Sequence, residues 1–155
     1  MDIRLCNKND EDSWIALNRQ FMLFEITDSS QWNDTDKTPD SVFRETFRDA
    51  LKSPSLIKLL IFEEDGVPIG FANLAVFFSI WSHGKGILMD DIFFVESCRG
   101  KGYGKIAMEY IENFAKENDC KRLEFMSKPS NQLSRDFYIA LGYKSVDMYF
   151  YVKHL

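Results

Sequence analysis

The sequence has few of the residues from which metal centres and thiol chemistry are built. Its 155 residues include two histidines, His83 and His154, too few for a histidine-based metal site. The three cysteines, Cys6, Cys98 and Cys120, are odd in number and contain no C-x-x-C pair, which fits a reducing compartment without a disulfide framework. We therefore expect no metal, and we interpret Cys98 as an incidental thiol rather than a nucleophile.

Long apolar runs and basic clusters are also lacking. No apolar run approaches the roughly 20 residues of a spanning helix, and the first residues, MDIRLCNKNDEDSW, are polar and unlike a signal peptide. The net charge is −5, whereas a nucleic-acid groove needs a basic face. The sequence predicts a cytoplasmic protein with no nucleic-acid or membrane partner. The sequence does not decide whether the protein forms a homodimer.

The sequence that remains is typical of one globular domain, which we place at 1–155. Hydrophobic residues make up 45% and charged residues 28%. Apolar periodicity and turn residues predict helices that begin near residues 9–12, 40, 103 and 133, and a long loop at 26–39. The predicted strands are 2–6, 56–66, 67–80, 87–95, 121–127 and 145–155. This order predicts an α/β (α+β) fold with a mixed sheet and helices on both faces.

A glycine-rich turn, RGKGYG at 99–104, lies between the strand ILMDDIFFV and a helix. A helix N-terminus presents unpaired N–H groups and partial positive charge, and glycines let the backbone close on a phosphate. The spacing does not fit the P-loop G-x-x-x-x-G-K-[ST] or the dinucleotide fingerprint G-x-G-x-x-G. It does fit [RQ]-x-x-G-x-[GA], the pattern of a coenzyme A pyrophosphate cradle.

A second motif follows about 30 residues later and consists of Asn131, Phe137-Tyr138 and Leu141-Gly142-Tyr143. With both motifs, the chain resembles the GCN5-related N-acetyltransferase (GNAT) superfamily over most of its length. LMDDIFF…RGKGYG is also similar to the diamine (polyamine) acetyltransferases. The resemblance implies a mostly antiparallel mixed sheet of six to seven strands flanked by about four helices. It also implies acetyl transfer from acetyl-CoA to an amine, without a metal.

The resemblance implies a set of cofactor contacts. The strand before the turn would pair with the pantetheine amides, and the turn's backbone N–H groups would hold the pyrophosphate. Asn131 would bond pantetheine, although a helix N-cap is a competing interpretation. The register of the pantetheine contacts is open by about one residue, because 95–98 departs from the family pattern. The implied cofactor-binding residues are Ile92, Phe93, Phe94, Arg99, Gly100, Lys101, Gly102, Tyr103, Gly104, Lys105, Asn131 and Tyr138.

Transfer to an alkylamine needs a base, because the amine is mostly protonated at pH 7, and an acid for the departing thiolate. Asp90 and Asp91 are adjacent, so strand alternation would send them to opposite faces and leave one facing the cleft. By this resemblance, Asp90 lies at the position where the polyamine acetyltransferases carry Glu. Because Asp is shorter than Glu, we expect a water molecule to relay the proton. The competing interpretation is that both are solvated or salt-bridged. Tyr138 occupies the family's tyrosine position and is predicted to be the acid, with simple packing as the alternative.

The acceptor side is expected to combine acidic and aromatic residues, which suit a cation. A solvated acidic loop over an aromatic core is the alternative. Three functions remain open: acetylation of a small-molecule amine such as a polyamine, aminoglycoside or amino-acid derivative; acetylation of a protein N-terminus or lysine; and acetyl-CoA binding without transfer. The predicted acceptor residues are Phe24, Glu25, Trp32, Phe78 and Trp81.

Overall fold

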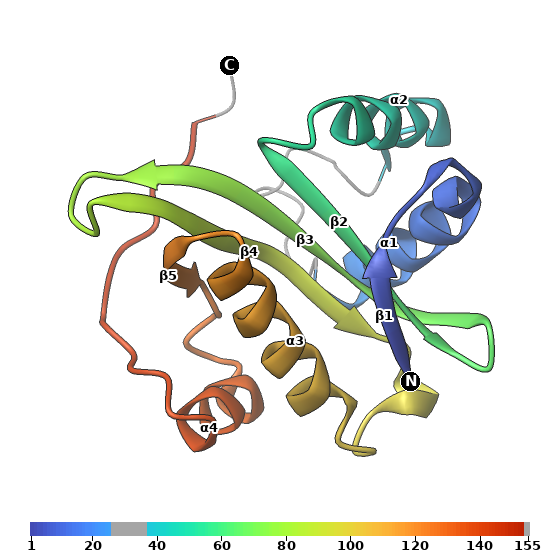
Figure 1. Ribbon diagram of the computed structural model, residues 1–155. Helices are drawn as coiled ribbons and strands as arrows, with labels where there is room; N and C mark the ends of the chain where they lie inside the picture. The colour runs from blue at the N-terminus through green and yellow to red at the C-terminus, as the bar shows by residue number, and fades with distance from the viewer. Residues whose placement is uncertain (26–36, 154–155) are drawn as a thin grey trace. The chain divides into compact units, whose positions relative to one another are not determined.

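The structure, a computed structural model, describes residues 1–25 and 37–153 and forms two compact units, Met1–Phe125 and Met126–Leu155. The second unit holds α4 (Gln132–Ala140) and a segment, 143–153, without helix or strand. Figure 1 shows the elements of the first unit, which are β1 (Asp2–Leu5), η1 (Lys8–Asp10), α1 (Glu11–Glu25), α2 (Asp40–Lys52), β2 (Ile57–Glu64), β3 (Val67–Ser79), β4 (Gly84–Phe94), η3 (Glu96–Cys98), α3 (Tyr103–Glu117) and β5 (Cys120–Phe125).

The sheet follows the order β1-β2-β3-β4-β5. The first four strands pair antiparallel, and β5 pairs parallel to β4. The predicted mixed, mostly antiparallel sheet and the four helices are therefore confirmed. The predicted six to seven strands are wrong, because the described residues form five.

The predicted strand at 145–155 is not formed in its described part, 145–153. Tyr149 and Tyr151 are 87% and 86% exposed. Alternating apolar residues indicate a strand only where a neighbouring strand supplies hydrogen bonds and side-chain packing. This segment has the pattern without such a neighbour among the described residues.

The two faces of the sheet are covered by different helices of the first unit. Figure 1 shows α3 crossing one face, with α1 and α2 behind the sheet. Alternate positions of β2 and β3, among them Leu59, Ile61 and Phe71, pack with Trp14 of α1 and Phe47 of α2 in one buried cluster. None of the described helices combines the length and apolar character needed to cross a bilayer.

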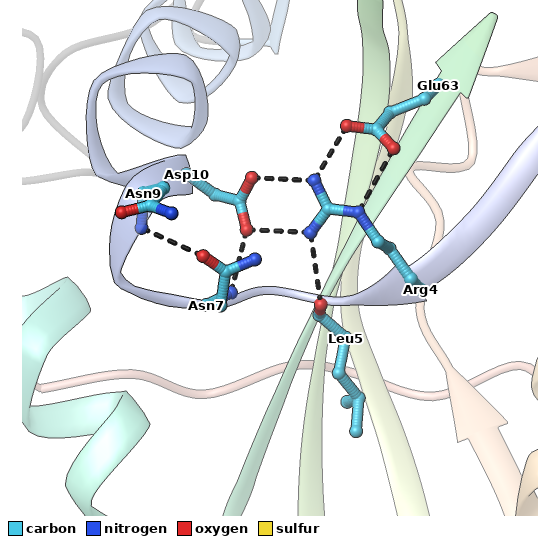
Figure 2. Close-up of polar contacts among 6 residues, drawn as sticks. All are labelled: Arg4, Leu5, Asn7, Asn9, Asp10 and Glu63. Carbon is cyan, nitrogen blue, oxygen red and sulfur yellow. Dashed lines mark hydrogen bonds and ion pairs between the residues drawn. The ribbon is translucent and has the colours of Figure 1, made fainter. Parts of the chain in front are cut away.

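An ion-pair cluster fixes the junction between β1 and α1 (Figure 2). The Arg4 guanidinium donates two hydrogen bonds of 2.8 Å to the Asp10 carboxylate and two, of 2.7 and 3.0 Å, to Glu63. Asp10 also accepts the Asn7 N–H at 2.7 Å. The hydrogen bonds from Arg4 hold the pKa of Asp10 below its ordinary value, even though burial acts in the opposite direction. This partly buried cluster is closed, because the Arg4 guanidinium is paired with both carboxylates.

Candidate functional site

The last part of β4 has one free edge. Pairing with β5 runs from Lys85↔Cys120 to Met89↔Phe125, and in the described residues positions 91–94 pair with β3 alone. The Val95 N–H donates to the Ile69 carbonyl at 2.9 Å, toward β3. Because backbone groups alternate in an antiparallel pair, those of Ile92 and Phe94 point to the opposite edge. An extended amide chain could add there as a strand.

A β-bulge interrupts β4 just before this edge. Asn73 lies opposite Asp91 and Leu74 lies opposite Met89, so Asp90 has no partner in β3. A bulge adds local twist and re-aims the chain. The bulge interrupts the regular strand pairing from which the alternation of the two carboxylates was predicted. Asp90 is exposed, whereas Asp91 is half-buried.

Asp91 is held by a chain of side chains from three elements. The Asn73 amide donates to Asp91 Oδ2 at 2.8 Å, and the Trp14 indole N–H donates to Asn73 Oδ1 at 3.0 Å. Asp91 therefore lies on the face of the sheet that α1 covers. Asn73 was missed in the sequence, although a polar residue inside the apolar strand FANLAVFF was a signal that could have identified it.

The glycine turn precedes α3 and carries a row of backbone N–H groups that have no acceptor among the described residues. Gly102 is the N-cap at φ 81°, and Gly100 has φ 74°, a left-handed conformation that favours glycine. The Arg99 N–H donates to the Glu96 carbonyl at 3.1 Å. From Gly100 to Gly104, no described residue accepts a hydrogen bond from the backbone N–H groups. The N–H groups without an acceptor therefore begin at Gly100, whereas the predicted set began at Arg99.

Glu64, at the end of β2, anchors this turn. The Tyr103 hydroxyl donates to Glu64, and Lys101 Nζ lies 3.6 Å from the same carboxylate. The hydrogen bond from Tyr103 lowers the pKa of Glu64, and it raises the pKa of Tyr103 to about 12. Lys105 lies 3.8 Å from Glu109, one helical turn along α3. Both lysines make long surface ion pairs that an anion could replace.

A cavity of about 280 Å³ adjoins the end of β4. The Arg99 guanidinium stacks on Phe24 at 4.2 Å from the ring centroid and lies 5.5 Å from that of Phe93. Its Nε donates to the Phe94 carbonyl at 3.2 Å. The cavity is lined by Gln20, Leu23, Phe24, Phe93, Glu96 and Arg99.

Two of the other predicted acceptor residues, Phe78 and Trp81, do not line this cavity. Phe78 and Trp81 are 68% and 89% exposed, and Phe78 pairs with Lys85 near the tip of the β3–β4 hairpin. That position is about 23 Å along the strand from Phe71, the partner of Phe93. Glu25 is the last residue of α1. Trp32 lies outside the described residues.

The second unit presents the other two motif residues. Asn131 is the N-cap of α4, and its Oδ1 accepts the Ser134 N–H at 3.1 Å, so any further ligand would have to use its Nδ2. The Tyr138 ring contacts Phe137 and Tyr143 at centroid distances of 5.1 and 6.0 Å. Burial raises the pKa of Tyr138, and its bond with Ser134 opposes this rise. The phenol therefore keeps its proton at neutral pH.

Two of the three cysteines, Cys6 and Cys98, are buried. Cys98 is buried in η3, and burial raises the pKa of Cys6 to about 12. Over residues 1–25 and 37–153, no group of three or more His, Cys, Asp or Glu side chains could hold a metal ion.

The chain is similar to known proteins in sequence and in fold. The model of the Acetyltransferase (GNAT) family matches residues 19–143. YhfO of Bacillus subtilis (strain 168), an uncharacterized N-acetyltransferase, is 33% identical over 86 residues, which are 56% of this chain and just 58% of YhfO. The D-amino-acid N-acetyltransferase HPA3 of Saccharomyces cerevisiae is 23% identical over 145 residues, covering 92% of this chain and 84% of HPA3.

One solved structure with the same fold is AAC(6')-Iy in complex with the bisubstrate analog CoA-S-monomethyl-acetylneamine. Its TM-score is 0.79 at 22% identity, covering 99% of this chain and 98% of that one. The family match spans well over half of the sequence. The chain therefore belongs to the GNAT family and is an N-acetyltransferase.

Proposed function

We propose that the protein transfers the acetyl group of acetyl-CoA to a primary amine of a small molecule by direct attack. One observation carries this proposal: the free edge of β4 leads through η3 into the unbonded N–H groups of Gly100–Gly104. The pantetheine amides would pair with Ile92 and Phe94 as an added strand. The pyrophosphate would lie at the N-terminus of α3, where the N–H groups and the helix dipole favour an anion.

The small-molecule acceptor is supported by the cavity and by the relatives. The cavity beside Phe24 is closer in size to a metabolite than to a peptide chain. HPA3 is named for acetylation of D-amino acids, and the ligand bound to AAC(6')-Iy joins coenzyme A to an acetylneamine. We extend this preference for small amines to the present chain.

The reaction forms one bond and breaks one. The amine nitrogen attacks the thioester carbonyl carbon, a C–N bond forms, and the C–S bond breaks to release the thiolate. A backbone N–H at the open edge of β4, that of Ile92 or Phe94, would stabilise the negative charge on the carbonyl oxygen.

Proton transfers complete the reaction. Before attack, the acceptor ammonium gives one proton to Asp91, which Asn73 holds in place, or through water to Asp90 on the bulge. The second proton leaves the nitrogen as the amide forms and returns through water to the phenol that has protonated the thiolate. Tyr138, which remains protonated at neutral pH, would give its proton to the departing thiolate. These roles of Asp90, Asp91 and Tyr138 are part of the proposal.

The test is an acceptor screen that follows release of free thiol from acetyl-CoA over diamines, amino acids, aminoglycosides and peptides. We expect turnover with small amines above the rate without acceptor, and mass spectrometry should show one added acetyl group. Turnover with peptides alone would move the function to protein acetylation. Binding of acetyl-CoA without turnover on any acceptor would contradict the proposal.

A further inference from the structure

The Arg99 side chain turns away from the glycine turn and toward the end of α1. It lies against Phe24 and Phe93, and its Nε donates to the Phe94 carbonyl. The backbone N–H of Arg99 is likewise used, by Glu96. The side chain therefore belongs to the wall of the cavity rather than to the row of N–H groups that begins at Gly100.

The guanidinium is fixed in place but only partly used. No described residue forms an ion pair with Arg99 or accepts a hydrogen bond from its two terminal nitrogens. Stacking on an aromatic ring occupies the face of a guanidinium and leaves its N–H edge available. Two parallel N–H groups on that edge match the two oxygens of a carboxylate.

The cavity lies close to the predicted site of amine attack. Phe93 and Asp91 are two positions apart on the same face of β4, which is about 7 Å along a strand. The volume, about 280 Å³, is that of roughly nine water molecules at ~30 Å³ each. An acceptor of about ten non-hydrogen atoms matches this volume, and its amine would have to extend about 7 Å along β4 from Phe93 to reach Asp91.

The charges that line the cavity are of both signs. Glu96 lines it together with Arg99 and the Gln20 amide. A purely cationic acceptor would meet the guanidinium, and a phosphate dianion would meet the Glu96 carboxylate. A molecule that carries both an ammonium and a carboxylate complements this lining better than either.

We propose that the acceptor is an amino acid whose carboxylate binds the terminal nitrogens of Arg99 while its amine lies near Asp91. This inference rests on the proposed function and narrows its substrate class from small amines to amines that carry a carboxylate. Arg99 is then a specificity-determining residue.

The experiment compares amino acids with their decarboxylated counterparts in the intact enzyme. The pairs are lysine and cadaverine, ornithine and putrescine, and phenylalanine and phenethylamine, with kcat/KM measured by thiol release. We expect the carboxylated member of at least one pair to be better by about tenfold or more, as for a hydrogen-bonded charge pair. Arg99→Gln should abolish that preference, and Arg99→Lys should reduce it, because lysine keeps the charge but loses the paired N–H geometry.

Lys101→Gln is the matched control, since it removes one cation from the neighbouring turn. It should raise the KM for acetyl-CoA and leave the ratio within each pair unchanged. If Arg99→Gln does not fold, as judged by its melting temperature, Arg99→Lys alone still decides the question.

Three results would overturn the inference. Decarboxylated amines could be equal or better acceptors in every pair. The preference for a carboxylate could survive in the Arg99 variants. Arg99→Gln could instead raise the KM for acetyl-CoA with no change in the ratios, which would assign the side chain to the coenzyme. In each case amines are still acetylated, so the proposed function stands. That function fails separately if no amine is acetylated by the wild-type enzyme.

Discussion

Two polar regions of the first unit differ in how completely they are satisfied. At the β1–α1 junction, Arg4 donates hydrogen bonds to both Asp10 and Glu63 (Figure 2). At the end of β4, the N–H groups of Gly100–Gly104 and the terminal nitrogens of Arg99 have no acceptor among the described residues. The first region is closed by its own side chains, and the second is left open.

The difference separates a polar cluster that stabilises the fold from one arranged to bind. Unused N–H groups carry little cost when they face water, and they become favourable when an anion arrives. A ligand could bind to the closed cluster only by first breaking the hydrogen bonds between Arg4 and the two carboxylates. Changes to the two regions should therefore have separable effects, on binding and turnover in one case and on stability in the other.

The largest effect is expected from Gly102→Asp. A side chain at φ 81° is strained, and its carboxylate would repel the pyrophosphate at the N-terminus of α3. Calorimetric titration should detect no binding of coenzyme A. Gly66→Asp is the control, because Gly66 also has a positive φ, 77°, with nothing within 4 Å of an added Cβ. Equal loss of binding in both variants would contradict the assignment of the cradle.

Tyr138→Phe should come next, with kcat reduced by about 10²- to 10⁴-fold, the usual range for loss of a proton donor. The affinity for acetyl-CoA should change little, because the ring contacts with Phe137 and Tyr143 are retained. Tyr143→Phe, which removes a neighbouring hydroxyl, should keep most of the turnover. Unchanged kcat in Tyr138→Phe would remove Tyr138 as the acid.

Asp10→Asn should lower the free energy of unfolding without weakening coenzyme A binding by the folded protein. We expect a loss of about 2 kcal/mol, less than for a fully buried pair because the Arg4 side chain is 37% exposed. The folded-state pKa of Asp10 lies below its ordinary value, so its contribution is present at neutral pH and is lost as the pH falls through that folded-state pKa.

Denaturant titrations at pH 7 and pH 3 give the measurement for this variant. The difference in stability between wild type and Asp10→Asn should shrink at the lower pH. A difference that stays constant with pH would show that the charge of Asp10 is not what stabilises the junction.

The smallest effect is expected from Tyr103→Phe. Glu64 raises the pKa of Tyr103 to about 12, so this phenol should titrate well above the ordinary value of about 10. An ultraviolet titration should show this late phenol in the wild type and its loss in the variant. If both proteins titrate alike, the Tyr103–Glu64 bond does not hold the turn.

The features that the sequence predicted correctly are those that depend on the pattern of neighbouring residues. The hairpin at Asp65-Gly66, the glycine turn and the helix that follows it were all identified from spacing. The Asp90 bulge and the Asn73–Asp91 bond depend on register across strands, which one strand's sequence does not encode. Arg99 was assigned to the coenzyme turn because of its motif, and its contact with Phe24 joins positions 75 residues apart.

The central claim is that the amides of Gly100–Gly104 are donors kept for coenzyme A, and amide hydrogen exchange tests it directly. Without ligand these N–H groups should exchange rapidly, because no described residue accepts their hydrogen bonds. Saturating coenzyme A should slow exchange at these positions and leave the Asn7 N–H, already bonded to Asp10, unchanged. Coenzyme A that binds without protecting the Gly100–Gly104 amides would contradict the account.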